Sequence, residues 1–175
     1  MKIVIINGSP RKGNTYTAIQ SFIEGAKDKN DIEVLEADKL NISPCKGCNT
    51  CQCYKGCVAS DDSNLVVDKL VQADMIIFGT PVYWWGMSAQ LKTVIDKSYC
   101  KGVLLKNKKI GIIVSGGAPT DDEEYVLIKK QFECMAKFLS WDIKFFKAYY
   151  ATGKDALAGD ADAIAELKAL GEQLS

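Results

Sequence analysis

The chain has 175 residues, of which 47% are hydrophobic and 25% charged, a composition typical of one globular domain and not of a disordered or fibrous protein. Its formal net charge is zero, which argues against a nucleic-acid-binding surface and against attachment to an anionic membrane. Histidine is absent, so a Ser-His-Asp triad, a histidine general base and a mixed Cys/His metal site are all excluded.

The start of the chain contains no segment that resembles a secretory signal peptide. Its first apolar run, Ile3–Ile6, is followed directly by Asn7 and Gly8 and is too short for the hydrophobic region of such a peptide. No apolar run reaches the length of a membrane-spanning helix. The seven cysteines are an odd number, which argues against a closed disulfide framework. We therefore expect a cytoplasmic protein in a reducing compartment.

Short apolar runs that alternate with helical patterns predict an α/β fold. Three runs, Ile3–Ile6, Met75–Phe78 and Ile110–Val114, are typical of strands buried on both faces, whereas Ile32–Leu35 and Ile143–Phe146 are mixed, as edge strands often are. The apolar positions of the helical patterns are Ala18, Ile19, Phe22, Ile23 and Ala26; Leu65, Val66, Leu70 and Val71; Leu91, Val94 and Ile95; Val126, Leu127, Met135, Ala136 and Leu139; and Ile164, Leu167, Leu170 and Leu174. This alternation predicts a parallel sheet with helices on both faces, in a single domain over residues 1–175.

A phosphate-binding loop is predicted between the first strand and the first helix. It reads Asn-Gly-Ser-Pro-Arg-Lys-Gly-Asn-Thr over residues 7–15. Backbone N–H groups at a helix N-terminus and hydroxyl side chains bind phosphate at this position of an α/β sheet. The spacing of Gly8 and Gly13 is close to that of a P-loop, but Asn14 stands where that motif needs lysine, so ATP or GTP hydrolysis is not expected. The loop is not Gly-x-Gly-x-x-Gly either, which argues against a dinucleotide site.

A loop rich in hydroxyl groups suits a terminal phosphate monoester, such as that of FMN. The residues expected to hold this phosphate are Ser9, Arg11, Gly13, Asn14 and Thr15. The alternative is an ordinary β–α turn whose polar residues only cap the helix. The segment from Gly8 to Thr15 also resembles the phosphate loop of the NADPH-dependent FMN reductases, a family with a flavodoxin-like fold.

Two further segments carry this resemblance. Residues 80–92 leave the third predicted strand and contain three adjacent aromatic residues, which are better placed to cover a planar ring than to fill a core. The family has a similar Pro-x-Tyr…Ser-x-x-x-Leu-Lys segment against its isoalloxazine ring. The ring contacts that the resemblance implies are Pro81, Val82, Tyr83, Trp84, Trp85 and Gly86, together with Ser115, Gly116 and Gly117 of a second loop. For the aromatic residues the alternative is a subunit interface, where Trp and Tyr are enriched.

Five cysteines lie within thirteen residues of an irregular segment, residues 41–60. Four of them follow the spacing Cys-x2-Cys-x2-Cys-x5-Cys, namely Cys45, Cys48, Cys51 and Cys57. Thiolates are soft ligands, and a 4Fe–4S cluster needs one at each of four corners. The spacing resembles the Cys-x2-Cys-x2-Cys-x(4–7)-Cys motif of the iron–sulfur flavoprotein branch of the same superfamily. The resemblance implies that these four residues bind a 4Fe–4S cluster.

Other uses of the cysteine segment remain open. Four thiolates also suit zinc, although zinc ribbons usually divide their ligands into two distant pairs. The segment can also be free of metal, as in many FMN reductases, or can perform thiol redox chemistry through a Cys51–Cys53 or a Cys48–Cys57 disulfide. The fifth cysteine, Cys53, departs from the motif and could serve in any of these ways. The two remaining cysteines, Cys100 and Cys134, are expected to be ordinary buried or half-buried residues.

The resemblance implies a doubly wound, flavodoxin-like sheet of five parallel strands in the order 2-1-3-4-5. It also implies an FMN-dependent oxidoreductase that passes electrons between FMN and a 4Fe–4S cluster, with NAD(P)H or ferredoxin as donor or partner and small molecules as acceptors. A homodimer or homotetramer is expected. No residue is an evident acid–base catalyst, which agrees with chemistry carried by cofactors. The alternatives are a cluster-free NAD(P)H-dependent FMN or quinone reductase and a non-catalytic electron carrier, although a carrier usually has an acidic surface.

Overall fold

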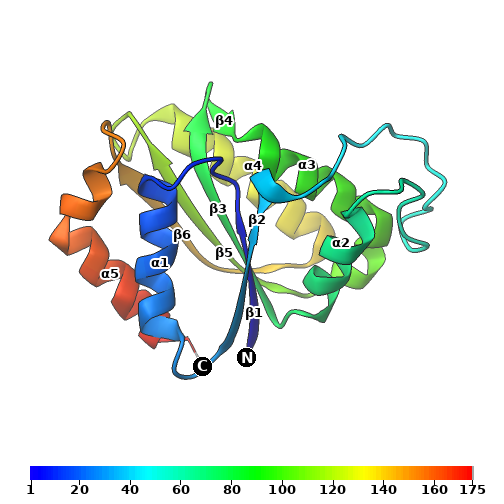
Figure 1. The fold of residues 1–175 in the computed structure, drawn as a ribbon, viewed down its shortest axis with the longest axis horizontal. Helices are drawn as coiled ribbons and strands as arrows, with labels where there is room; N and C mark the ends of the chain where they lie inside the picture. Colours follow the sequence, from blue (N-terminus) through cyan, green and yellow to red (C-terminus); the bar gives the residue numbers. More distant parts are fainter. Residues whose placement is uncertain (175) are drawn as a thin grey trace.

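A parallel sheet forms the centre of the molecule in the computed structural model, which describes residues 1–174 (Figure 1). Its strands are β1 (Lys2–Asn7), β2 (Asp31–Glu36), β3 (Met75–Tyr83), β4 (Gly86–Met87), β5 (Lys109–Gly116) and β6 (Asp142–Tyr150). The order is β2-β1-β3-β5-β6, and all four neighbouring pairs along it are parallel. The short β4 pairs antiparallel with the end of β3. With β4 set aside, this is the predicted order of a flavodoxin-like sheet.

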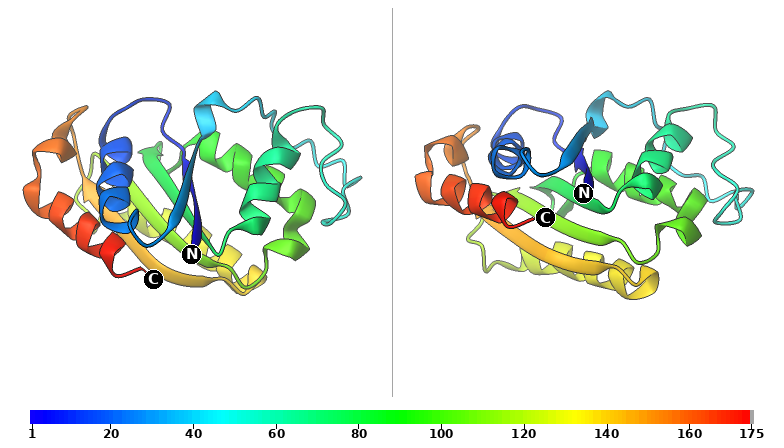
Figure 2. Two further views of the ribbon diagram at one scale, coloured as in Figure 1. Left: turned by 60° about the horizontal axis from the view of Figure 1, so that its bottom comes forward. Right: turned by 90° about the horizontal axis from the view of Figure 1, so that it is seen from below.

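Helices cover both faces of the sheet, as predicted. The helices are α1 (Asn14–Ala26), α2 (Ser63–Gln72), α3 (Ala89–Ser98), α4 (Glu123–Leu139) and α5 (Ala161–Glu172), with short 3-10 helices η1 (Ala37–Lys39), η2 (Tyr99–Leu105) and η3 (Ala156–Gly159). The first and last helices, α1 and α5, lie side by side on one face, and α2, α3 and α4 lie on the other (Figures 1 and 2). Among residues 1–174, no helix combines the length and the apolar character needed to span a membrane.

Alternating side chains of the central strands explain these two layers. Ile3 and Ile5 belong to the core beneath α1 and α5, whereas Val4 and Ile6 belong to the core beneath α2, α3 and α4. All four are completely buried. Because successive residues of a strand point to opposite faces, a continuously apolar strand must be covered on both sides. The mixed runs at β2 and β6 are the two edge strands, as their composition predicts.

Two strands are longer than the apolar runs indicate. β3 continues past Phe78 because Gly79, Thr80 and Pro81 remain paired with β5, with Pro81 opposite Ser115. Pairing with β5 likewise extends β6 to Tyr150. In β3, tertiary pairing thus extends a strand through Gly79 and Pro81, which have low strand propensity. The two-residue β4 is too short to produce a periodic pattern, and the sequence did not predict it.

Candidate cofactor site and cysteine cavity

The three loops predicted to bind flavin meet at the carboxyl edge of the sheet, because β1, β3 and β5 are adjacent parallel strands. The backbone N–H of Gly8 donates to the carbonyl of Gly79 at 2.8 Å, and the Ser88 hydroxyl donates to the carbonyl of Gly8 at 2.7 Å. An added Cβ at Gly8 would lie 2.8 Å from both Ser88 Oγ and Leu91 Cβ, so this position requires glycine. The β1–α1 loop is therefore held directly against β3 and the start of α3.

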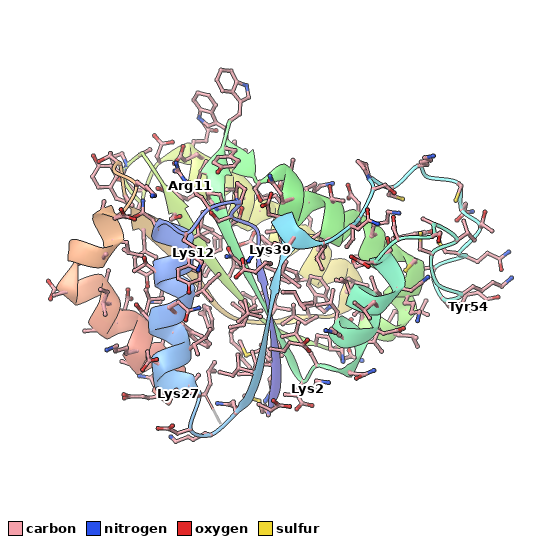
Figure 3. The ribbon with its side chains drawn as sticks, in the orientation of Figure 1. Lys2, Arg11, Lys12, Lys27, Lys39 and Tyr54 are labelled. Atoms are coloured by element: carbon pink, nitrogen blue, oxygen red, sulfur yellow. The ribbon has the colours of Figure 1, made fainter. Side chains whose placement is uncertain are left out.

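The phosphate loop forms a tight turn that leads into the N-terminus of α1. Ser9 Oγ donates to the carbonyl of Arg11 at 2.8 Å and accepts from the Arg11 N–H at 3.3 Å. Gly13 is the N-cap of α1, and an added Cβ there would lie 2.9 Å from the carbonyl oxygen of Lys154. The first N–H groups of a helix have no partner within it, and the exposed Arg11 and Lys12 add positive charge beside them (Figure 3). This arrangement fits a bound phosphate.

Two of the predicted phosphate residues have side chains that bind other parts of the protein. Asn14 Nδ2 donates to the carbonyl of Gly153 at 2.6 Å, and Asn14 Oδ1 accepts from the N–H of Leu157 at 3.0 Å. The Thr15 and Ser115 hydroxyl oxygens are 2.7 Å apart, and both residues are buried. Asn14 therefore holds the segment before α5 against α1, while Thr15 joins the phosphate loop to the predicted ring loop after β5.

The aromatic residues of the predicted ring segment form the turn between β3 and β4. Trp84 and Trp85 have φ angles of 48° and 61°, and their rings meet edge to face with centroids 5.5 Å apart. Such left-handed pairs in two-residue turns usually contain Asn and Gly, so two tryptophans here impose local strain. Trp84 is 92% exposed. As predicted, these residues are not part of the core; both a flavin cover and a subunit contact remain consistent with their exposure.

The predicted ring loop after β5 brings two glycines next to an unpartnered carboxylate. Gly117 has no atom within 4 Å of an added Cβ, so its backbone lies open. An added Cβ at Gly116 would lie 2.5 Å from Glu124 Oε1 and 2.8 Å from Val82 Cγ2. Glu124 Oε1 is buried near the Tyr125 hydroxyl, but that hydroxyl donates to the carbonyl of Ala118 at 2.9 Å, which leaves the oxygen without a well-placed donor among residues 1–174. A ring that carries an N–H group, as flavin does, would supply the donor that this oxygen lacks.

Glu124 was not identified from the sequence as a site residue. It lies in the first turn of α4, where Asp122 is the N-cap and accepts the Glu124 N–H at 3.0 Å. Acidic residues at a helix start are explained by the helix dipole alone, so the sequence contains no separate signal for a binding role. Only the proximity of Glu124 to Gly116 indicates one.

The cysteine segment is a loop whose two ends are joined by hydrogen bonds. The backbone N–H of Asn41 donates to Asp62 Oδ2 at 2.8 Å, and the Asp62 N–H donates to the carbonyl of Asn41 at 2.9 Å. Ser43 donates to Asp61 Oδ2 through its N–H at 3.1 Å and its hydroxyl at 2.8 Å. Figures 1 and 3 show the loop on the far side of α2 and α3 from α1, with Tyr54 near its tip.

Five left-handed residues bend this loop around a cavity of about 650 Å³. These residues are Gly47, Asn49, Gln52, Cys53 and Gly56. The cavity is lined by all four predicted ligands, Cys45, Cys48, Cys51 and Cys57. Cys53 does not line it: its Sγ packs against Gly102 of η2, where an added Cβ would lie 2.9 Å away. The fold therefore separates the four cysteines of the motif from the fifth.

The four thiols surround the cavity without converging on one point. Within residues 1–174, no three Cys, Asp or Glu side chains lie close enough together to hold a single metal ion. Zinc would need four sulfurs at about 2.3 Å from one centre. A 4Fe–4S cluster is a larger body with one thiolate at each of four corners, and soft donors around a cavity fit it better. All seven cysteines are free thiols here, including the two pairs considered as disulfides.

The cysteines differ from one another in the pKa of their thiols and in their exposure to solvent. Cys100 also lines the cavity, but burial raises the pKa of its thiol to about 11, which keeps it protonated at neutral pH. Cys48 has the opposite tendency, because hydrogen bonds from Thr50 hold the pKa of its thiol below the usual value. Cys100 is buried, as predicted. The prediction for Cys134 was wrong: it is exposed, because its position on α4 faces away from the sheet.

Lys97 and Asp61 form a buried ion pair at the wall of this cavity. Lys97 Nζ is 3.2 Å from Asp61 Oδ2 and 3.5 Å from Cys57 Sγ. Burial opposes the charge of Asp61, but hydrogen bonds from Ser63 and Ser43 outweigh it and hold the pKa of the carboxyl far below its usual value. Burial also opposes the charge of Lys97, but its pKa is raised by Asp61 and Cys57. The sequence did not indicate this pair.

The chain matches the family model described as NADPH-dependent FMN reductase over residues 1–129. It is 35% identical over 128 residues to an iron–sulfur flavoprotein of Methanocaldococcus jannaschii, covering 71% of this chain and 66% of the relative. An iron–sulfur flavoprotein of Methanosarcina thermophila is 36% identical over 129 residues, covering 71% and 68%. The alignments thus span about two thirds of these relatives. The Trp repressor binding protein from Bacillus subtilis shares the fold, with a TM-score of 0.71, 21% identity and coverage of 97% and 99%.

Proposed function

Because this chain belongs to the NADPH-dependent FMN reductase family, we propose that it is an FMN-dependent oxidoreductase that passes electrons between FMN and a 4Fe–4S cluster. Cys45, Cys48, Cys51 and Cys57 are the proposed cluster ligands. One observation carries the cluster assignment: these four line a single cavity, whereas Cys53 packs elsewhere. The names of the two archaeal relatives, both iron–sulfur flavoproteins, support the same assignment.

The proposed FMN site lies across the ends of β1, β3 and β5. The N–H groups of the first turn of α1, with Arg11, would hold the phosphate, while Ser9 shapes the turn before them. The hydrogen bond between Thr15 and Ser115 keeps the phosphate and ring loops at a constant separation. The open backbone at Gly117 admits the edge of a planar ring.

The chain's own residues position the cofactors and supply no evident acid or base. Bound FMN would accept electrons in pairs and release them singly, and the cluster would carry one at a time. The exposed Trp84 and Trp85 would exclude water from one side of the ring or contact a second subunit. Proposed partners are NAD(P)H or ferredoxin, small-molecule acceptors and further copies of this chain, as a homodimer or homotetramer in the cytoplasm.

A cluster-free NAD(P)H-dependent FMN or quinone reductase is the second candidate. It is favoured by the family model that the chain matches, whose description names NADPH and FMN and no cluster. In that case the loop would be a structural or protein-binding feature, and the flavin alone would pass electrons to the acceptor.

Analysis of the protein purified without oxygen distinguishes the two candidates. Iron, acid-labile sulfide and flavin are measured together with the visible spectrum. About four irons and four sulfides for each FMN-bearing chain are expected. Flavin without iron would contradict the cluster assignment and favour the cluster-free reductase. Protein that binds no flavin even after incubation with FMN would contradict both.

A further inference from the structure

We propose that Lys97 is a positioning residue that donates a hydrogen bond to Cys57 and places a fixed positive charge beside the cysteine cavity, which raises the reduction potential of the bound cluster. This inference rests on the proposed function. It concerns a residue of α3 that lies outside both the cysteine motif and the flavin loops.

The position of Lys97 is unusual for a lysine. Its side chain is 5% exposed and that of Asp61 is 7% exposed, although lysine is almost never fully buried unless it is paired. Its ammonium group lies 3.5 Å from Cys57 Sγ and 3.2 Å from Asp61 Oδ2. These are its two hydrogen-bond partners within residues 1–174, although an ammonium group carries three N–H donors.

Asp61 does not depend on Lys97 to satisfy its carboxylate. Ser43 donates to it twice, through its N–H and its hydroxyl. Ser63 also donates twice, through its N–H at 3.0 Å and through its hydroxyl. The four neutral donors keep Asp61 ionised, and Asp61 accepts only one of the three N–H donors of Lys97. The other N–H donors of a buried ammonium group are costly to leave unpaired, and a negative group is the acceptor that satisfies them best.

The negative group that the geometry indicates is the sulfur of Cys57. Asn64 holds the Cys57 backbone in place: the Cys57 N–H donates to Asn64 Oδ1, and Asn64 Nδ2 donates to the carbonyl of Cys57, both at 2.8 Å. The Cys57 backbone is thereby anchored to the first turn of α2 and cannot move away from α3 without breaking these bonds. The sulfur therefore stays within reach of the Lys97 ammonium group, which it meets at 3.5 Å.

Other charges around the cavity do not replace Lys97. Asp96 lines the cavity but pairs with Lys92 at 2.6 Å, and both side chains are more than two-fifths exposed. Lys46 also lines the cavity and is exposed on the loop. Charges in contact with water are strongly screened, whereas a buried charge is screened much less.

Reduction adds one electron to a cluster whose thiolate ligands already make it negative. A fixed positive charge and an N–H···S hydrogen bond both favour the more negative, reduced form, because net charge and hydrogen bonds to sulfur set cluster potentials. Lys97 would thus make the cluster a better acceptor of single electrons from FMN. The hydrogen-bond partners of Lys97 within residues 1–174 are Cys57 and Asp61, and none of the predicted flavin residues lines the cysteine cavity.

The test is a redox titration of the loaded protein carrying Lys97→Met. The cluster potential is followed by electron paramagnetic resonance and the flavin potential by absorbance in the same sample. We expect the equilibrium constant for electron transfer from FMN to the cluster to fall about tenfold, equivalent to about 59 mV for one electron. The flavin potential should stay unchanged, and Lys97→Arg should restore most of the cluster potential.

The matched control is Lys101→Met, which removes another partly buried lysine near the same loop, one that pairs with Asp68. A smaller shift in this control supports the proposal, and an equal shift overturns it. An unchanged cluster potential in Lys97→Met also overturns it. If Lys97→Met holds no cluster, Lys97→Gln is measured instead, with the same two outcomes. Wild-type protein that assembles no cluster overturns the proposed function and this inference together.

Discussion

Thr15 and Ser115 are one hundred residues apart in the chain, yet their buried hydroxyl oxygens lie 2.7 Å from each other. This hydrogen bond joins the start of α1 to the end of β5, and therefore the phosphate loop to the loop predicted to contact the flavin ring. It is possible because β1 and β5 both flank β3, which brings their carboxyl ends together. The separation between the two halves of the proposed flavin site is thus set by a contact inside the protein.

Replacing the hydroxyls of this region should weaken FMN binding. In the double variant Ser9→Ala and Thr15→Ala, the turn before α1 and the link to Ser115 are both lost, and affinity should fall by about 1–3 kcal/mol. Isothermal titration of the apoprotein with FMN measures this change. Thr93→Ala, which removes a hydroxyl bonded only to the backbone of α3, is the control. Unchanged affinity in the double variant would place the phosphate elsewhere.

The positive φ angles at Trp84 and Trp85 should lower the stability of the apoprotein, whereas the two tryptophan side chains should strengthen FMN binding. Changing the pair to Asn-Gly, the residues preferred where both φ angles are positive, should raise the free energy of unfolding of the apoprotein by about 1 kcal/mol. FMN affinity should fall at the same time. Urea denaturation and FMN titration are the two measurements. Unchanged affinity with a loss of oligomer would instead assign the tryptophans to a subunit interface.

Glu124 should matter to the flavin site more than to the fold. Its buried oxygen has no well-placed donor among the described residues, and Glu123 and Glu124 both lie in the first turn of α4, so Glu124→Ala should destabilise the apoprotein no more than Glu123→Ala does. If this oxygen accepts an N–H of the flavin ring, the same variant should bind FMN about 1–3 kcal/mol more weakly. The exposed neighbour Glu123 provides the control, as Glu123→Ala. Equal FMN affinity in both variants would contradict a ring contact by Glu124.

Substitution of Cys48 and of Cys53 should have different effects on the cluster, because only Cys48 lines the cavity. Cys48→Ser should abolish the cluster and leave FMN bound, because Cys48 lines the cavity and the flavin loops do not include it. Cys53→Ser should leave iron and sulfide contents near the wild-type values, because its sulfur packs against Gly102. Both variants are purified without oxygen for iron, sulfide and flavin analysis. Loss of iron from Cys53→Ser alone would show that the ligand assignment is wrong.

Asp61 should make the stability of the protein sensitive to acid. Its pKa in the folded state is held far below the usual value of 3.8, so the unfolded chain binds the proton more tightly. The contribution of Asp61 is therefore complete above about pH 5 and is lost progressively as the pH falls below the unfolded value of 3.8 toward the lower pKa of the folded state. Urea denaturation between about pH 2 and 5 should show a shallower pH dependence in Asp61→Asn than in the wild type. Asp96→Asn, at an exposed pair, should keep the wild-type dependence.

The cysteine loop shows where prediction from sequence stopped. The spacing of Cys45, Cys48, Cys51 and Cys57 predicted a ligand set, but it could not decide the position of Cys53, which has the same chemistry and lies between two of the predicted ligands. The left-handed backbone at Gln52 and Cys53 turns this thiol toward η2. The direction in which a loop side chain points depends on such φ angles and on packing against distant elements. Neither of these can be read from the spacing of residues in the sequence.

The sequence by itself determined the layers of the fold and the order of its loops, because buried strands and amphipathic helices leave patterns of neighbouring residues. It also predicted a phosphate loop, an aromatic ring segment and a set of four cysteine ligands, because such chemistry depends on residue type and local spacing. Only the tertiary structure placed Lys97 beside Cys57 and Glu124 beside Gly116. Lys97 and Cys57 are separated by 40 residues and lie on different elements. Contacts of this kind follow from how helices pack on the sheet, which no local pattern of residues records.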